Sequence, residues 1–215
     1  GRILMRQCAD QIKKVSLELG GNAPFIVFDD ADLDAAVEGA MASKYRNAGQ
    51  TCVCANRIYV QSNVYDAFAA KLAAKVSALS VGDGFKPGVT VGPLIDEQGV
   101  AKAEDHVRDA VAKGARVALG GQRIEGAGTF FAPTILTGVD RSMKVAREET
   151  FGPVAPLIRF EIVEDVIAQA NDTEFGLAAY FFAGDLKKVW RVAEALEYGM
   201  VGINTGIMSS ETAPF

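Results

Sequence analysis

The chain has 215 residues, 49% hydrophobic and 23% charged, a composition that supports a buried core and excludes an intrinsically disordered protein. Its 22 lysines and arginines against 27 aspartates and glutamates give a formal net charge of -5, which argues against a nucleic-acid-binding protein. No uninterrupted apolar run approaches the roughly 18 residues that would span a bilayer, so we expect a soluble protein with no membrane partner. At roughly 100–200 residues per domain, the length fits one domain with a fragment of another.

The three cysteines, Cys8, Cys52 and Cys54, are too few and too odd in number for a disulfide framework. They indicate a reducing compartment, so we expect a cytoplasmic protein. The Cys-X-Cys spacing has no neighbouring histidine and is not that of a zinc site, so no metal is expected. Because the chain begins at Gly1 without an initiator methionine or a signal peptide, we expect a piece of a longer protein.

Short β-rich runs alternate with longer helical patterns along the chain, which is typical of an α/β domain. Acidic residues at Asp29, Asp30 and Asp32 mark the start of the first of these helices. We expect strands at 24–28, 57–60, 116–119, 130–136, 153–160, 177–183 and 200–204, and helices at 32–46, 63–79, 96–113, 163–171 and 186–198, with a glycine- and proline-rich loop at 81–94. Helices between strands favour parallel pairing, so we predict a mostly parallel sheet flanked by helices.

Two side chains at junctions between these elements could carry chemistry. Glu18 lies between apolar neighbours before a Gly-Gly turn, where burial would suit a general base; the alternative is a surface glutamate. Cys52 follows a glycine-containing connection and is a candidate nucleophile, although a lone cysteine is more often a buried small hydrophobe. The reactive thiolate form is favoured by nearby positive charge, for which Arg46 is a candidate unless it is a solvated cation at a helix end.

The single histidine, His106, lies in a predicted helix among charged residues, and we expect it to face solvent rather than to pair with Cys52. A thiol and a carboxylate without a useful histidine suit acyl-enzyme chemistry, in which the carboxylate activates water.

Several motifs occur in the order found in one family: LELGG at 17–21, GQTC at 49–52, EETFGP at 148–153, and GINTG at 202–206 ahead of APF at 213–215. In these motifs the chain resembles the aldehyde dehydrogenase superfamily over essentially its whole length. The segment YRNAGQTCVCANR at 45–57 is most similar to the bacterial succinate-semialdehyde branch of that family.

The resemblance implies a role for each matching residue. Cys52 would be the nucleophile and Glu18 the general base, with Leu19 making a backbone contact near the nicotinamide. Glu149 would hold the nicotinamide ribose hydroxyls and Phe151 would pack behind the ring, while Glu148 would be structural. The distal carboxylate of the substrate would be bound by Arg46 and Ser209, with Ser210 as the alternative if the register differs by one residue.

The resemblance also implies the domain organisation and the reaction. Residues 1–20 would be the tail of a missing dinucleotide-binding domain, and residues 21–215 the catalytic domain, truncated before an oligomerisation strand. No G-x-G-x-x-G motif follows a strand, so nothing in the chain would bind the adenosine end of a dinucleotide. The implied activity is oxidation of succinic semialdehyde to succinate with NADP, or alternatively NAD, by a parent protein that forms a homo-oligomer.

Two other functions stay open, as does one possible regulation. The substrate could be another semialdehyde or an ω-amino-aldehyde, or the chain could be a non-catalytic interaction module, because exposed apolar surfaces associate. Cys52 and Cys54 could form a disulfide that switches the thiol off, although so small a ring would be strained; the alternative is that Cys54 is a packed small residue.

Overall fold

The computed structural model describes residues 1–126 and 128–212. Within these residues the strands are β1 (Ala23–Val27), β2 (Ala55–Gln61), β3 (Arg116–Leu119), β4 (Thr134–Thr137), β5 (Val154–Phe160), β6 (Ala178–Phe182) and β7 (Met200–Ile203). The helices are α1 (Arg2–Ala9), α2 (Leu33–Lys44), α3 (Ser62–Val76), α4 (Glu97–Ala112), α5 (Lys144–Arg147), α6 (Val163–Asn171) and α7 (Leu186–Ala195), with a 3-10 turn, η1, at Arg46–Gly49.

The strands form one seven-stranded sheet in the order β3-β4-β5-β2-β1-β6-β7. Every neighbouring pair is parallel except β3 with β4, which is antiparallel. Helices connect the parallel strands, since a parallel pair needs a crossover that returns the chain to the same edge. The predicted α/β architecture with a mostly parallel sheet flanked by helices is confirmed.

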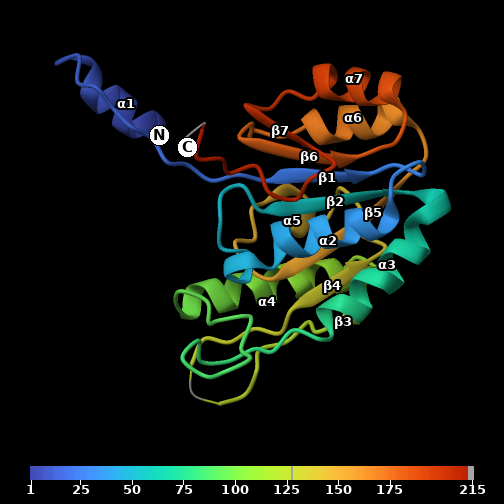
Figure 1. Ribbon diagram of the computed structural model, residues 1–215. Coiled ribbons are helices and arrows are strands. Elements are labelled where there is room, and N and C mark those ends of the chain that lie inside the picture. The colour runs from blue at the N-terminus through green and yellow to red at the C-terminus, as the bar shows by residue number, and fades with distance from the viewer. Residues whose placement is uncertain (127, 213–215) are drawn as a thin grey trace.

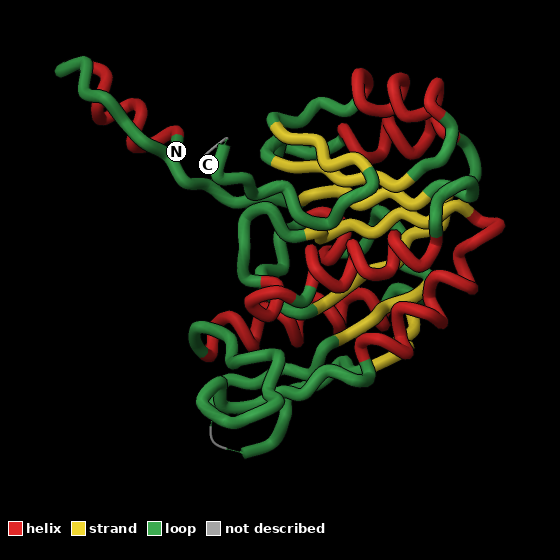
Figure 2. The backbone as a smooth tube through the Cα atoms, in the orientation of Figure 1, coloured by secondary structure: helices red, strands yellow, loops and turns green. Residues whose placement is uncertain are grey.

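Two apolar layers cover the faces of this sheet (Figure 2). Alternate residues of a strand point to opposite faces, so Phe25 and Val27 of β1 pack with α2 and α3, while Ile26 packs with α4, α6 and α7. Helix α2 begins at Asp32, whose carboxylate accepts the backbone N–H groups of Asp34 and Ala35 at 3.0 Å.

Residues 1–20 form an N-terminal arm, which contrasts with this packed body. Helix α1 contains no buried residue, and it projects away from the sheet (Figure 1). Its apolar side chains are exposed, among them Ile3 at 68%. The arm therefore adds little to the core.

Most element boundaries fall within a few residues of the predicted ones, and the exceptions have local causes. Strand β4 begins four residues late, because Phe131 forms only an isolated bridge with Arg123 and Pro133 has no N–H to donate. Helix α7 ends three residues early, because the Asn171 amide accepts the N–H of Glu197 and donates to the carbonyl of Ala195. Helix α5 and the η1 turn, only four residues each, were not predicted.

Candidate active site

The sheet topology brings the candidate site residues together at the amino-terminal ends of four neighbouring strands. The LELGG motif precedes β1, Cys52 precedes β2, the EETFGP motif precedes β5, and Phe175 lies shortly before β6. These four strands are neighbours in the order β5-β2-β1-β6 and run parallel, so their amino-terminal ends lie side by side (Figure 1).

Close backbone contacts at this end of the strands join three of the motifs. A Cβ on Gly21 would lie 2.0 Å from the carbonyl oxygen of Cys52, and a Cβ on Gly49 would lie 2.2 Å from that of Gly152. Gly49 also has a φ of 75°, in the region that favours glycine. Glycine is thus required at both positions for the turn that carries Cys52 to lie against its neighbours.

Cys52 is half-buried in a turn held from two sides. The N–H of Cys54 donates to the Thr51 carbonyl at 3.1 Å, and the Tyr180 hydroxyl donates to the Val53 carbonyl at 2.8 Å. Burial raises the pKa of Tyr180 to about 12, so this donor keeps its proton. Among the described residues, no hydrogen bond uses the N–H of Cys52, and this leaves the group available to an oxyanion.

A buried polar cluster that the sequence reasoning missed lies behind this turn. The Lys44 amino group, 0% exposed, donates to Asn56 Oδ1 at 2.9 Å and contacts Cys54 Sγ at 3.5 Å. Burial raises the pKa of the Cys54 thiol, with Lys44 opposing the shift. The spacing of Val37, Ala40 and Lys44 in the sequence could have predicted the burial of this lysine, because it places the three residues on one face of α2.

Glu149 and Phe151 lie beside the Gly-Gly turn. The Glu149 carboxylate is half-buried and accepts the N–H of Gly21 at 2.9 Å, and burial raises its pKa against that hydrogen bond. Its second oxygen would lie 2.6 Å from a Cβ on Gly20, so glycine at this position allows the carboxylate to lie against the backbone. Phe151 is 38% exposed. A carboxylate acceptor and an accessible aromatic ring fit the ribose and nicotinamide of a dinucleotide.

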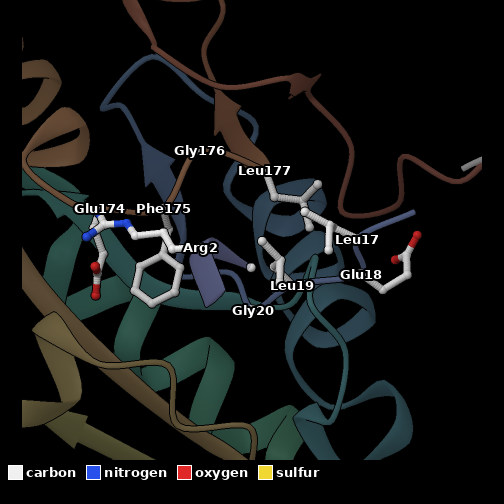
Figure 3. Close-up of a pocket in the computed structure, with 10 residues that line it drawn as sticks. Arg2, Leu17, Glu18, Leu19, Gly20, Glu174, Phe175, Gly176 and Leu177 are labelled. Carbon is white, nitrogen blue, oxygen red and sulfur yellow. The ribbon is translucent and has the colours of Figure 1, made fainter. Parts of the chain in front are cut away.

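A cavity of about 680 Å³ lies beside Gly20, between the arm and the segment before β6 (Figure 3). Leu19, Gly20 and Phe175 line it, and Leu19 is exposed. Glu18 also borders it, but its carboxylate points away from Phe175. Of the two alternatives for Glu18, the described chain shows an exposed glutamate and not a buried one.

The structure describes Arg46, Ser209 and Ser210, and all three are exposed. Arg46 follows the end of α2, while Gly206 packs so closely on that helix that a Cβ would lie 2.0 Å from the Gly39 carbonyl oxygen. The segment after β7 therefore contacts α2 at Gly39. The APF motif at 213–215 lies outside the described residues.

The expectation that His106 faces solvent is wrong. Its side chain is 1% exposed, with Nδ1 3.0 Å from Thr150 Oγ1 and Nε2 3.4 Å from Glu148 Oε2. The charged neighbours in sequence lie on other faces of α4, whose buried residues include Ala103 and Ala110 at helical spacing from His106.

A second buried cation was also missed. Arg57 is 2% exposed, and its guanidinium donates to the carbonyls of Asn22, Gln169 and Ala170 and to the hydroxyl of Tyr198. It joins the start of β1, beside the candidate site, to the end of α6.

Within the part of the chain that the structure describes, no group of three or more His, Cys, Asp or Glu side chains is placed to hold a metal ion. No described helix is long and apolar enough to cross a membrane.

The chain is similar to known proteins over its whole length. Residues 1–215 match the model of the aldehyde dehydrogenase family. The whole chain is 71% identical to the NADP(+) succinate-semialdehyde dehydrogenase GabD of Escherichia coli, and 68% identical to a glutarate-semialdehyde dehydrogenase of Pseudomonas putida. It covers 45% and 44% of those proteins, so the chain spans less than half the length of these relatives. A crystal structure of succinate-semialdehyde dehydrogenase from Burkholderia pseudomallei superposes with a TM-score of 0.98 at 65% identity, covering 100% of this chain and 44% of that one.

Proposed function

The chain belongs to the aldehyde dehydrogenase family, and from that premise we propose that it is the catalytic part of an NADP-dependent enzyme that oxidises succinic semialdehyde to succinate. The observation that carries the proposal is the contact of Gly21 with the backbone of Cys52 and with the carboxylate of Glu149. One backbone position thereby links the candidate nucleophile to the candidate cofactor-binding carboxylate.

In the proposed reaction, the Cys52 thiolate attacks the aldehyde carbon and the N–H of Cys52 donates to the oxyanion that forms. A bound nicotinamide supplies the acceptor for the hydride that leaves this carbon. Glu149 would hold the ribose hydroxyls, Phe151 would pack against the nicotinamide ring, and Leu19 would contact the nicotinamide through its backbone. A thioester then remains on Cys52.

Hydrolysis of this thioester is assigned to Glu18, which takes a proton from the attacking water. Its side chain is exposed in the described chain. Arg46 binds the distal carboxylate of the substrate, and Ser209 adds a hydroxyl donor, with Ser210 as the alternative.

The cofactor and the assembly belong to the same proposal. NADP is favoured over NAD because relatives at 71% and 66% identity are named as NADP(+) enzymes. Residues 1–20 are assigned to the tail of a dinucleotide-binding domain and 21–215 to the catalytic domain. The parent protein is proposed to be a cytoplasmic homo-oligomer.

Glutarate semialdehyde is a second candidate substrate, because a relative at 68% identity is named for it. It carries the same two functional groups, an aldehyde and a carboxylate, separated by a longer chain. An ω-amino-aldehyde would instead bring a cation toward Arg46, which disfavours it. A non-catalytic interaction module would need none of these residues.

The proposal is tested by the absorbance of reduced nicotinamide when succinic semialdehyde and NADP are mixed with the enzyme in which this chain is joined to its cofactor-binding part. We expect turnover in the wild type and none in Cys52→Ala. Turnover that survives Cys52→Ala would exclude the assigned nucleophile. Equal rates with a neutral aldehyde of the same length would exclude the carboxylate-bearing substrate class.

A further inference from the structure

His106 lies outside the cavity but contacts the segment that carries Glu149 and Phe151. It sits on α4 among buried apolar side chains, and its ring nitrogens reach Thr150 Oγ1 at 3.0 Å and Glu148 Oε2 at 3.4 Å. A carboxylate can only accept, so the proton lies on Nε2 and the hydroxyl of Thr150 donates to Nδ1. One imidazole thus bonds two residues of the EETF stretch.

Because the backbone of this stretch is extended, the contact of His106 with Glu148 and Thr150 also orients Glu149, which lies between them. Glu148 has the extended dihedrals φ -112° and ψ 143°. Successive side chains of an extended segment point to opposite sides. Glu148 and Thr150 point to His106, whereas Glu149 points the other way, to the N–H of Gly21.

The last residue of this stretch, Phe151, is restricted as well. Phe151 adopts a φ of 54°, uncommon for a residue with a side chain, and Thr150 before it is 1% exposed. The hydrogen bond between the buried Thr150 hydroxyl and the buried His106 ring fixes the position of the residue before Phe151.

We propose that His106 is a positioning residue for the nicotinamide-ribose site, acting through Glu148 and Thr150 to hold Glu149 and Phe151 in place. This inference rests on the proposed function, since it assigns a purpose to the two residues that would hold the cofactor. His106 itself touches neither the cofactor nor the substrate in this scheme.

Three variants test the inference. His106→Phe keeps a planar ring and removes both hydrogen bonds, while His106→Asn retains an amide that can reach Thr150. Arg108→Ala is the matched control, because Arg108 is on the same helix with a side chain that is 74% exposed. Thermal unfolding identifies any variant that does not fold, and the comparison uses the folded ones.

The first measurement needs no cofactor. Hydrogen exchange at the Gly21 amide reports its bond to Glu149, and we expect it to be about tenfold faster in His106→Phe, unchanged in Arg108→Ala and largely restored in His106→Asn. Exchange in His106→Phe at the wild-type rate overturns the proposal. Equal acceleration in His106→Asn also overturns it, because the effect would then come from lost packing.

The second measurement uses the enzyme with its cofactor-binding part. We expect His106→Phe to raise KM for NADP about tenfold and to leave KM for the aldehyde within about twofold. Faster exchange at Gly21 with an unchanged KM for NADP would overturn the link to the cofactor. A wild type without any turnover would refute the proposed function, whereas the exchange measurement would still decide whether His106 holds Glu149.

Discussion

At the scale of single residues, the candidate site depends on a few buried polar groups rather than on the exposed ones. Lys44, Arg57 and His106 each bond to segments that carry candidate site residues. The buried Cys54 thiol contacts Lys44, which favours the packed-residue interpretation of Cys54 over a disulfide with Cys52. Arg46, which is proposed to bind the substrate carboxylate, is by contrast exposed.

Arg46→Ala should remove most of the preference for substrates that carry a carboxylate. A charge-assisted hydrogen bond contributes about 1.5–3 kcal/mol, so we expect KM for succinic semialdehyde to rise roughly 10- to 100-fold. The rate with a neutral aldehyde of the same length should change little. Steady-state kinetics on both aldehydes measures this, with Arg108→Ala as the control, and an unchanged preference would contradict the assignment of Arg46.

The single histidine gives the folding stability a defined pH dependence. Burial is the main cause that lowers the pKa of His106 below 6.5, while Glu148 and Asp105 oppose the shift and Lys102 adds to it. The unfolded chain then binds more protons, so the stabilisation is present above about pH 6.5 and is lost as the pH falls through the lower folded pKa. Urea unfolding between about pH 5 and 7 should show this slope in the wild type and a smaller one in His106→Asn. Identical slopes would contradict the burial of a neutral ring.

At the scale of elements, the site is assembled from loops that precede neighbouring parallel strands, and glycines decide how closely those loops approach. Gly21 and Gly49 both lie where a side chain would overlap the backbone of another motif. The strands fix the starting points of the loops, and the glycines determine the final contacts.

Gly21→Ala tests this control directly. The added methyl group would lie 2.0 Å from the Cys52 carbonyl oxygen, so we expect a loss of about 1–3 kcal/mol in the free energy of unfolding and a slower alkylation of Cys52. Gly84→Ala is the matched control, since no atom lies within 4 Å of the position of its Cβ. Equal effects of the two substitutions on stability and on alkylation would contradict the account.

The same element scale separates what the sequence could predict from what it could not. Alternating apolar runs and helix caps such as Asp32 predicted the order of the main strands and helices, because those signals are local. The burial of His106 and Arg57 was not predicted, because their partners Thr150 and Gln169 are distant in sequence. Glu18 and Cys52 were candidates from their positions between elements, whereas Glu149 was found only through motif resemblance. The roles of all three remain predictions.

At the scale of the whole molecule, a packed body carries an arm that buries almost nothing. Helix α1 has no buried residue, while the sheet is covered on both faces. Ile3, Leu4 and Met5 of the arm are exposed, and exposed apolar groups promote association.

Deleting residues 1–12 should therefore leave the body intact. We expect the midpoint of thermal unfolding to change by less than about 2 °C, because no buried contact is lost. Light scattering across a concentration series should show less self-association than in the full chain. A fall of roughly 10 °C would instead mean that the arm belongs to the core.

Formation of a succinyl thioester on Cys52 can be tested without any cofactor, by acylation with a 4-nitrophenyl monoester of succinate. Attack by the Cys52 thiolate releases nitrophenolate and leaves the same thioester that aldehyde oxidation would form. We expect peptide mass analysis to show a succinyl group on Cys52 and none on Cys54, accumulation of this thioester in Glu18→Gln, and no labelling in Cys52→Ala. Equal labelling of the Cys52→Ala variant, or a succinyl group on Cys54 in place of Cys52, would contradict this expectation.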